Sequence, residues 1–178
     1  LQLHSIGKRY RFEWIFKDLN YQFQSGRGYA ILGNNGSGKS TLMQILSGHL
    51  SPSKGHLEYH VANQDIALDK IYQDLSFVAP YIELVEEFTL QEAVDFHWNF
   101  KKMKCSKKEL LDRLEYPKSA FQKNIKFFSS GMQQRLKLIL AICSDTPLLL
   151  LDEPTITLDR NAVDWYVKLL KDYAYSPD

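Results

Sequence analysis

A glycine-rich loop between an apolar run and a helix-like segment constrains the fold of this chain more than any other feature. Residues 33–40 read Gly-Asn-Asn-Gly-Ser-Gly-Lys-Ser and fit the pattern GxxxxGK[ST] at every fixed position. The apolar run over residues 28–33 predicts a buried strand, and residues 40–48 predict a helix that stops near Gly48. A strand, this loop and a helix, in that order, are the setting in which such a loop binds phosphate.

The residue types in this loop suit that chemistry. Glycines let consecutive backbone N–H groups converge on phosphate oxygens, and the positive end of the following helix adds to the attraction. We expect Lys39 to act at the β- and γ-phosphates, the Ser40 hydroxyl to ligate Mg²⁺, and Thr41 to lie near the α-phosphate. The predicted nucleotide-binding residues of this segment are Gly33, Asn34, Asn35, Gly36, Ser37, Gly38, Lys39, Ser40 and Thr41.

Two acidic residues follow a second apolar run. Residues 148–151 are four leucines, which predict a buried strand, and Asp152, Glu153 and Pro154 come directly after them. Downstream of a phosphate loop, we expect Asp152 to hold Mg²⁺ and Glu153 to polarise an attacking water as general base. Taken alone, the same acids would be equally consistent with the start of a solvated loop.

The rest of the chain alternates strand-like and helix-like patterns. Residues 1–25 predict antiparallel strands, and residues 55–79 return to a strand-like pattern. Residues 85–125 predict a mainly helical insertion with capping boxes at Thr89–Glu92 and Ser106–Glu109. Two further amphipathic helices are expected, one opening at residues 130–133 with Ser130 and Gln133 fitting a capping box, and one starting near Asp159. Strands separated by helices around phosphate motifs indicate an α/β core with a parallel sheet.

Composition excludes several classes of protein. The 178 residues carry a net charge of +1, which gives no bulk attraction to nucleic acid. The two cysteines form no CxxC pair, and the five histidines are scattered with no metal-ligand spacing, so a reduced, cytosolic setting is expected. No signal peptide is visible and the apolar stretches are too short to span a bilayer, so any link to a membrane would go through a partner.

Residues 128–135, Phe-Ser-Ser-Gly-Met-Gln-Gln-Arg, open onto a helix far downstream of the phosphate loop. Alone they would read as a helix cap. With the Gly33 loop, the Asp152-Glu153 pair and the Ile-Thr-Leu-Asp run at residues 156–159, they resemble the signature of the ATP-binding cassette (ABC) family, usually Leu-Ser-Gly-Gly-Gln. The order and spacing of the four motifs match that family across essentially the whole chain.

The resemblance implies a fold, a function and partners. The fold is an α/β P-loop (Walker A) NTPase core with a mainly parallel sheet, an N-terminal antiparallel β part and an inserted helical part. It implies one ATPase domain over residues 1–178, with residues 1–84 and 127–178 as core, residues 85–126 as helical subdomain, and a C-terminal end that is missing. It further implies an ATP-hydrolysing subunit that powers a membrane transporter. The implied partners are a transmembrane permease and a second ATPase subunit, in a homodimer or a heterodimer, and nucleic acid is not among them. The implied location is the cytoplasmic face of the inner or plasma membrane.

In that family two chains pack head to tail around ATP. The resemblance implies that Ser129 and the backbone N–H of Gly131 meet the γ-phosphate of ATP bound to the opposite chain. It also places an aromatic ring over adenine, and Tyr10 is at the expected distance ahead of Gly33. Phe12 and Trp14 are close competitors for that role, and any of the three rings could instead belong to the core.

Three departures from the family pattern affect these expectations. Ser130 replaces a glycine and Met132 replaces the glutamine of the signature. Pro80 stands where the family has a glutamine, and the family's histidine would follow Asp178. We therefore expect the chain to bind ATP better than it hydrolyses it. Two alternatives stay open at this stage: a soluble ABC-type ATPase of DNA repair or translation, and a nucleotide-regulated binding module.

Overall fold

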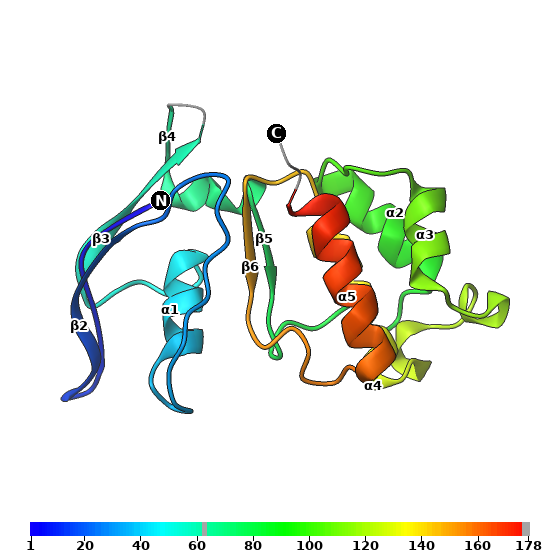
Figure 1. Ribbon diagram of the computed structural model, residues 1–178, viewed down its shortest axis with the longest axis horizontal. Helices are drawn as coiled ribbons and strands as arrows, with labels where there is room; N and C mark the ends of the chain where they lie inside the picture. The colour runs from blue at the N-terminus through cyan, green and yellow to red at the C-terminus, as the bar shows by residue number, and fades with distance from the viewer. Residues whose placement is uncertain (62–63, 176–178) are drawn as a thin grey trace. The chain divides into compact units, whose positions relative to one another are not determined.

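The structure is a computed structural model that describes residues 1–61 and 64–175. The chain forms two compact units, Leu1–Leu75 and Ser76–Asp178, and each is described by itself (Figure 1). The phosphate loop belongs to the first unit. The acidic pair and the Ser129 segment belong to the second.

The first unit is built on an antiparallel sheet with the strand order β2-β1-β3-β4. Its strands are β1 (Gln2–Tyr10), β2 (Glu13–Gln22), β3 (Lys54–Val61) and β4 (Gln64–Ile66). Helix α1 (Lys39–Leu46) packs on one face of the sheet, where the buried Tyr59 hydroxyl donates a hydrogen bond to the Leu46 carbonyl at 2.9 Å. A 3₁₀ turn, Leu68–Gln73, completes the unit. The antiparallel strands predicted at the N-terminus are confirmed.

The strand predicted over residues 28–33 is not formed. Residues 27–34 have no regular secondary structure, and the side chain of Leu32 is 88% exposed. An extended run becomes a strand only when its backbone N–H and C=O groups pair with a neighbouring strand. In the described part of the chain no strand pairs with residues 28–33, so the prediction of a buried strand was wrong.

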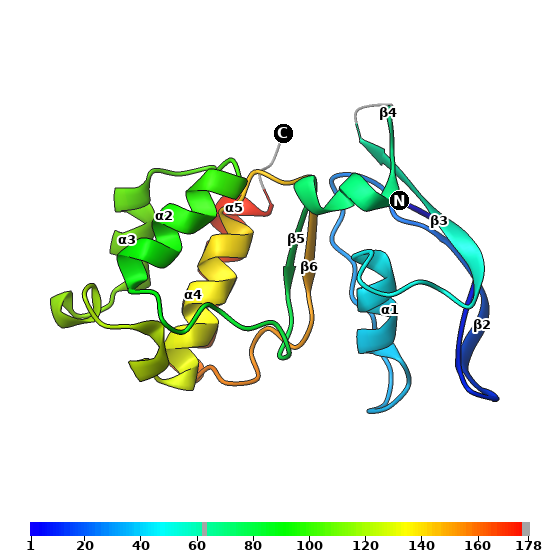
Figure 2. The same ribbon diagram turned by 180° about the vertical axis from the view of Figure 1, so that it is seen from behind.

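The second unit combines a short sheet with four helices. The strands are β5 (Leu75–Val78) and β6 (Leu148–Leu151), which lie side by side in Figure 2. The helices are α2 (Leu90–Phe100), α3 (Lys107–Leu114), α4 (Ser130–Ile142) and α5 (Arg160–Tyr173), with 3₁₀ turns at Lys118–Ala120 and Ile125–Phe127. The mainly helical stretch predicted over residues 85–125 is confirmed.

Two hydrogen bonds show that β5 and β6 run parallel. Near their starts, the hydroxyl of Thr146, two residues before β6, donates to the Ser76 hydroxyl at 2.9 Å. At their ends, the N–H of Asp152, one residue after β6, donates to the Val78 carbonyl at 2.8 Å. The starts of the two strands are therefore neighbours and so are their ends, which brings Asp152 to the carboxyl edge of the sheet, where α/β proteins bind ligands. The predicted α/β fold, with an antiparallel N-terminal sheet and a parallel sheet, is confirmed.

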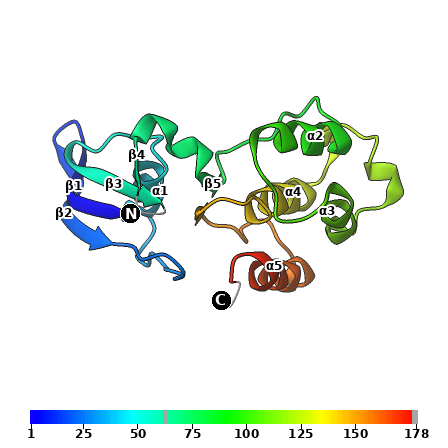
Figure 3. The same ribbon diagram turned by 90° about the horizontal axis from the view of Figure 1, so that it is seen from above.

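Helix α4 lies at the centre of the second unit, with α5 on one side and α2 and α3 on the other (Figure 3). The amphipathic helix expected here is confirmed, because four of the five apolar residues on its inner face are buried and the fifth, Met132, packs against the core. The buried four are Leu136, Ile139, Leu140 and Cys143. Burying side chains of this size contributes about 1.5–3 kcal/mol each, so α4 is the helix on which the unit depends.

Helix starts follow their predicted caps in most cases. Both bonds of the Thr89–Glu92 capping box are present: the Thr89 hydroxyl accepts from the Glu92 N–H, and the Glu92 carboxylate accepts from the Thr89 N–H at 2.8 Å. Asp159 caps α5 by accepting from the Ala162 N–H at 2.8 Å. Ser106 caps α3 by accepting from the Glu109 N–H, but the Glu109 carboxylate accepts from the Tyr173 hydroxyl instead, so only one half of the predicted capping box is formed.

His97 of α2 gives the second unit a pH-dependent stability. It is partly buried with Nε2 at 2.9 Å from the Ser144 hydroxyl, and burial, with a smaller contribution from Lys101, lowers its pKa to about 4. The unfolded chain takes up a proton near the ordinary pKa of 6.5, so the free energy of unfolding falls as the pH drops from 6.5 towards 4.

We expect the free energy of unfolding of the wild type to fall by about 2 kcal/mol between pH 7 and pH 5 because of His97. Urea unfolding followed by tryptophan fluorescence measures this loss, and His97→Gln, which has no titrating group at this position, isolates it. Equal pH dependence in the two proteins would contradict the buried, neutral histidine.

Candidate functional site

Two glycines with left-handed backbone conformations shape the loop that opens α1. Gly36 has φ 80° and Gly38, the N-cap of α1, has φ 92°. A Cβ atom on Gly38 would lie 2.4 Å from Cγ2 of Ile15 in β2. Glycine is therefore required at position 38 both by its φ angle and by its close approach to the sheet.

The side chain of Lys39 folds back over this loop. Its Nζ donates hydrogen bonds to the carbonyl oxygens of Gly33 at 2.9 Å and Asn34 at 2.8 Å. No acidic residue occupies the first turn of α1. The positive charge of Lys39 thus lies at a helix start that already favours anions, with neutral carbonyl groups as its partners.

The three candidate aromatic rings for adenine differ in how far they are already packed. Trp14 is partly buried against Gly7 and has two cations near its ring, Arg9 at 5.7 Å and Lys17 at 5.0 Å. Tyr10, at the end of β1, is 50% exposed with Lys8 at 5.3 Å from its ring, and Phe12, in the turn between β1 and β2, is 98% exposed. Trp14 is thus the least free of the three to stack on a base, which leaves Tyr10 and Phe12.

The two acidic residues after β6 lie in different environments. Asp152 is 6% exposed, and its Oδ2 is buried without a hydrogen-bond partner. Glu153 is exposed and adopts a left-handed backbone conformation with φ 47°, which is strained for a residue with a Cβ. An unpartnered carboxylate oxygen suits a cation ligand, and an exposed, strained glutamate at a strand end suits a group held for chemistry.

The cap of α4 differs from the prediction by one residue. Ser129 is the N-cap: its hydroxyl accepts from the Met132 N–H at 3.2 Å, and its carbonyl accepts from the Gln133 N–H at 2.9 Å. Ser130 is instead the first helical residue. The predicted Ser130–Gln133 capping box is therefore wrong, because with Ser129 in the extended conformation of a cap the chain is already helical at Ser130.

Ser129 and the start of α4 face solvent. Ser129 and Ser130 are both exposed, so Ser129 is not turned into the core. In the described residues, the N–H groups of Ser130 and Gly131 have no hydrogen-bond partner, as expected for the first turn of a helix. The tip of α4 therefore presents one hydroxyl group and two backbone donors at the positive end of the helix.

A contact that the sequence analysis missed links this tip to the acidic pair. Gln134, only 4% exposed, donates from Nε2 to the Pro154 carbonyl at 2.8 Å. A Cβ on Gly131 would lie 3.4 Å from the carbonyl oxygen of Thr157, so the tip also packs against the loop that follows Glu153. A buried glutamine within the apolar stretch of α4 was the available signal, since buried amides are normally hydrogen-bonded.

Two departures from the family pattern have clear structural settings. Met132 is partly buried, and its carbonyl accepts a hydrogen bond from the Tyr116 hydroxyl. Pro80 is exposed two residues beyond the end of β5. Neither position holds a side-chain group that could hydrogen-bond as a glutamine would.

A sequence profile of the family described as "ABC transporter" matches residues 16–156. The chain belongs to the ABC transporter family. It is an ATP-binding ATPase cassette of the kind that powers such transporters. The match includes the phosphate loop, the Ser129 segment and the acidic pair.

Relatives and solved structures agree with this assignment. An uncharacterized ABC transporter ATP-binding protein, YclH of Bacillus subtilis, is 28% identical over all of this chain and 83% of its own length. The energy-coupling factor transporter ATP-binding protein EcfA3 of Oenococcus oeni is 31% identical over 86% of this chain and 57% of its own length. The dimeric structure of MJ0796, a bacterial ABC transporter cassette, is 26% identical and superposes with a TM-score of 0.78 over 96% of this chain and 81% of that one. A second MJ0796 structure, a post-hydrolysis state bound to ADP and Pi, has the same TM-score.

The chain spans a variable share of its relatives, 83% of YclH but 53% of the Nod factor export ATP-binding protein I of Rhizobium johnstonii. Among residues 1–61 and 64–175, no helix has the length and apolar character needed to cross a membrane.

The cap assignment predicts unequal effects of two neighbouring serines. We expect Ser129→Ala to lower the free energy of unfolding of the second unit by about 1 kcal/mol, because it removes the side-chain acceptor at the N-cap. Ser130→Ala, the matched control one residue on, should change it by less than about 0.5 kcal/mol. Chemical denaturation of both variants measures the difference. A larger loss of stability in Ser130→Ala than in Ser129→Ala would show that Ser130 is the cap.

Proposed function

We propose that this cassette binds ATP with Mg²⁺ and powers a transmembrane permease by closing head to tail on a second ATPase subunit. The observation that carries this proposal is the exposed tip of α4, where Ser129 and two backbone N–H groups face solvent. A donor group at an exposed helix start is suited to an anion supplied from outside its own unit.

The phosphate loop is the proposed site for the triphosphate. Its backbone from Gly33 to Ser40 would bind the phosphates, and Lys39 would exchange its two carbonyl partners for β- and γ-phosphate oxygens. Thr41, in the same first turn of α1, would bind near the α-phosphate. Tyr10 would stack on adenine, a contact that needs only an exposed ring face.

Ser40 and Asp152 are the proposed Mg²⁺ ligands. Among the described residues the buried Oδ2 of Asp152 has no hydrogen-bond partner, which fits such a role. Bound Mg²⁺ would neutralise charge that develops on the phosphates. Glu153 would orient a water molecule and accept its proton as general base. The support for assigning these residues and the phosphate loop to one nucleotide is the family match, which runs through both motifs.

Ser129 and Gly131 are the proposed contacts to the γ-phosphate held by the partner subunit. Gln134 and the Gly131–Thr157 contact join this tip to the loop of Glu153. A movement of the Glu153 loop after ATP hydrolysis would therefore be transmitted to the tip of α4, because both belong to the same packed unit. Loss of the γ-phosphate would remove the ligand of the tip and release the partner.

The proposed domain organisation is one ATPase domain with residues 1–84 and 127–178 as nucleotide-binding core and residues 85–126 as helical subdomain. Phe96 and Phe100 are 48% and 69% exposed, and the Phe96 ring contacts both the Phe88 ring, edge-on, and the Phe100 ring, at a tilt. These three aromatic residues are the surface we propose for the permease, and the cytoplasmic face of the membrane is the location we propose for the chain. Exposed aromatic groups of this kind are enriched at protein interfaces.

Lys39→Ala should weaken ATP binding about 10- to 100-fold, because it removes charge-assisted hydrogen bonds to the phosphates. Titration with a fluorescent ATP analogue measures the affinity. Lys70→Ala is the matched control, since Lys70 is an exposed lysine of the same unit. An unchanged affinity in the Lys39 variant would contradict the assignment of the phosphate loop.

Glu153→Gln should leave ATP affinity intact, slow hydrolysis at least about 100-fold, and trap an ATP-bound dimer. Steady-state phosphate release and sizing by light scattering, with and without Mg-ATP, measure both effects. Adding Ser129→Arg to this variant should return it to a monomer without loss of ATP binding. Normal turnover would exclude Glu153 as the base, and loss of monomer binding in the double variant would mean that Ser129 contacts ATP in its own chain.

A further inference from the structure

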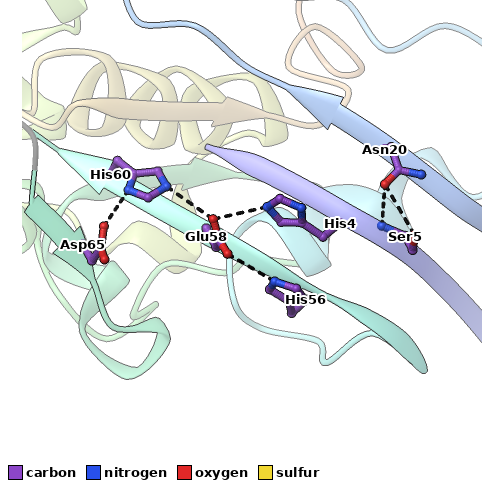
Figure 4. Close-up of polar contacts among 7 residues, drawn as sticks. All are labelled: His4, Ser5, Asn20, His56, Glu58, His60 and Asp65. Carbon is purple, nitrogen blue, oxygen red and sulfur yellow. Dashed lines mark hydrogen bonds and ion pairs between the residues drawn. The ribbon is translucent and has the colours of Figure 1, made fainter.

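Three of the five histidines gather on one face of the antiparallel sheet, although the sequence scatters them (Figure 4). β3 carries His56, Glu58 and His60 at alternate positions, so all three side chains lie on the same face. His4 of β1 pairs directly with His56, and Asp65 of β4 pairs directly with His60. Strand pairing thus assembles three imidazole rings and two carboxylates from three strands.

The ring nitrogens of this cluster converge on a single carboxylate. The Nε2 atoms of His4 and His56 each lie 3.2 Å from an oxygen of Glu58, and Nε2 of His60 lies 3.6 Å from it. The rings of His4 and His56 stack with centroids 4.7 Å apart. One ligand atom from each of His4, His56 and Glu58 lies within 4.8 Å of the other two.

His4 supplies a second observation that points to a cation here. Its Nε2 atom is buried and has no hydrogen-bond partner within residues 1–61 and 64–175, although a Glu58 oxygen lies close to it. The contact has the distance of an ion pair without the geometry of a hydrogen bond. A buried ring nitrogen aimed at a carboxylate without a hydrogen bond is a position that a cation would satisfy.

His60 has the orientation that metal-binding histidines commonly show. Its Nδ1 lies 2.6 Å from Oδ1 of Asp65, while its Nε2 faces Glu58. When Nδ1 donates its proton to a carboxylate, the lone pair on Nε2 is left for a metal. His60 is not one of the three residues whose ligand atoms lie within 4.8 Å of one another, so it would act as a neighbour of Glu58 beside the site.

The cluster lies away from the phosphate loop. Tyr59, between Glu58 and His60 in β3, points to the opposite face, where it is 4% exposed and bonds to Leu46 of α1. Leu3, next to His4, is 3% exposed on that same inner face. Since α1 begins at the phosphate loop and packs on the inner face, the histidine cluster occupies the outer face of the sheet.

We propose that His4, His56 and Glu58 form a binding site for one divalent transition-metal cation such as Zn²⁺. Imidazole nitrogens with a carboxylate are the ligands preferred by zinc, copper and nickel, whereas Mg²⁺ and Ca²⁺ prefer oxygen ligands alone. A tetrahedral zinc with bonds of about 2.1 Å holds its ligands about 3.4 Å apart. A Glu58 oxygen already lies 3.2 Å from Nε2 of each histidine, so the ligand nitrogens of His4 and His56, which lie within 4.8 Å of each other, are the pair that would have to approach.

Isothermal titration of the untagged, metal-free protein with Zn²⁺, without nucleotide, tests the site. We expect one Zn²⁺ per chain, unaffected by a large excess of Mg²⁺. His4→Gln and His56→Gln should each weaken binding at least about 10-fold, because each removes one ligand. His49→Gln is the matched control, since His49 is in the same unit and bonds to Ser47 instead. Circular dichroism of each variant verifies that the sheet is intact.

A second measurement separates this site from the nucleotide site. Lys39→Ala should bind Zn²⁺ as the wild type does, whatever becomes of its ATP affinity. Cobalt added in place of zinc should give absorption bands of a nitrogen- and oxygen-ligated ion, and His56→Gln should abolish them. The site is excluded if folded His56→Gln binds Zn²⁺ as tightly as wild type, if His49→Gln loses binding equally, or if Mg²⁺ displaces the zinc.

Discussion

The burial of helix α4 is the interaction on which the second unit depends. Its inner face, with Leu136, Ile139 and Cys143 each 0% exposed, fixes the helix between α5 and the pair α2 and α3. Because α4 is held there, Gln134 reaches the Pro154 carbonyl, and the tip at Ser129 projects from a rigid support. A polar group that must be presented to a partner subunit is most precise when it stands at the end of an element whose other face is buried.

Each unit has a residue with a positive φ angle at a proposed functional position. Gly38 combines a φ of 92° with an approach to Ile15 that leaves no room for a Cβ atom, and Glu153 has a φ of 47° that its own Cβ disfavours. Glycine adopts such a φ readily, whereas Glu153 is held by the surrounding structure in a conformation that its Cβ makes costly. Helix α1 packs on the sheet through Leu46 and Tyr59. Gln134 bonds to the carbonyl of Pro154, the residue after Glu153. Burial at such contacts offsets the free-energy cost of a strained backbone.

The sequence predicted the structural features that are decided by neighbouring residues. It did not predict those that depend on residues far away in the chain. Thr89 and Ser106 cap their helices as expected, because a cap is decided by residues three positions apart. Residues 28–33 fit a strand pattern but gain no neighbour, and strand formation is a property of the pair. The histidines were judged scattered because His4 stands 52 positions before His56, whereas strand pairing places the two side by side. The alternation His56-x-Glu58-x-His60 was the local signal available, since a strand turns alternate residues to one face.

The tip of α4 also accounts for how this cassette can depart from the usual signature. Ser130, in place of a glycine, is the exposed first residue of the helix, where a small polar side chain meets solvent and costs little. Met132, in place of a glutamine, contributes backbone groups: its N–H bonds to the Ser129 hydroxyl and its carbonyl to Tyr116. The donors left at the tip are the backbone N–H groups of Ser130 and Gly131 and the Ser129 hydroxyl, none of which requires the replaced side chains. A phosphate bound there would rely on the helix start itself, whose geometry is set by the N-cap and by the buried face of α4.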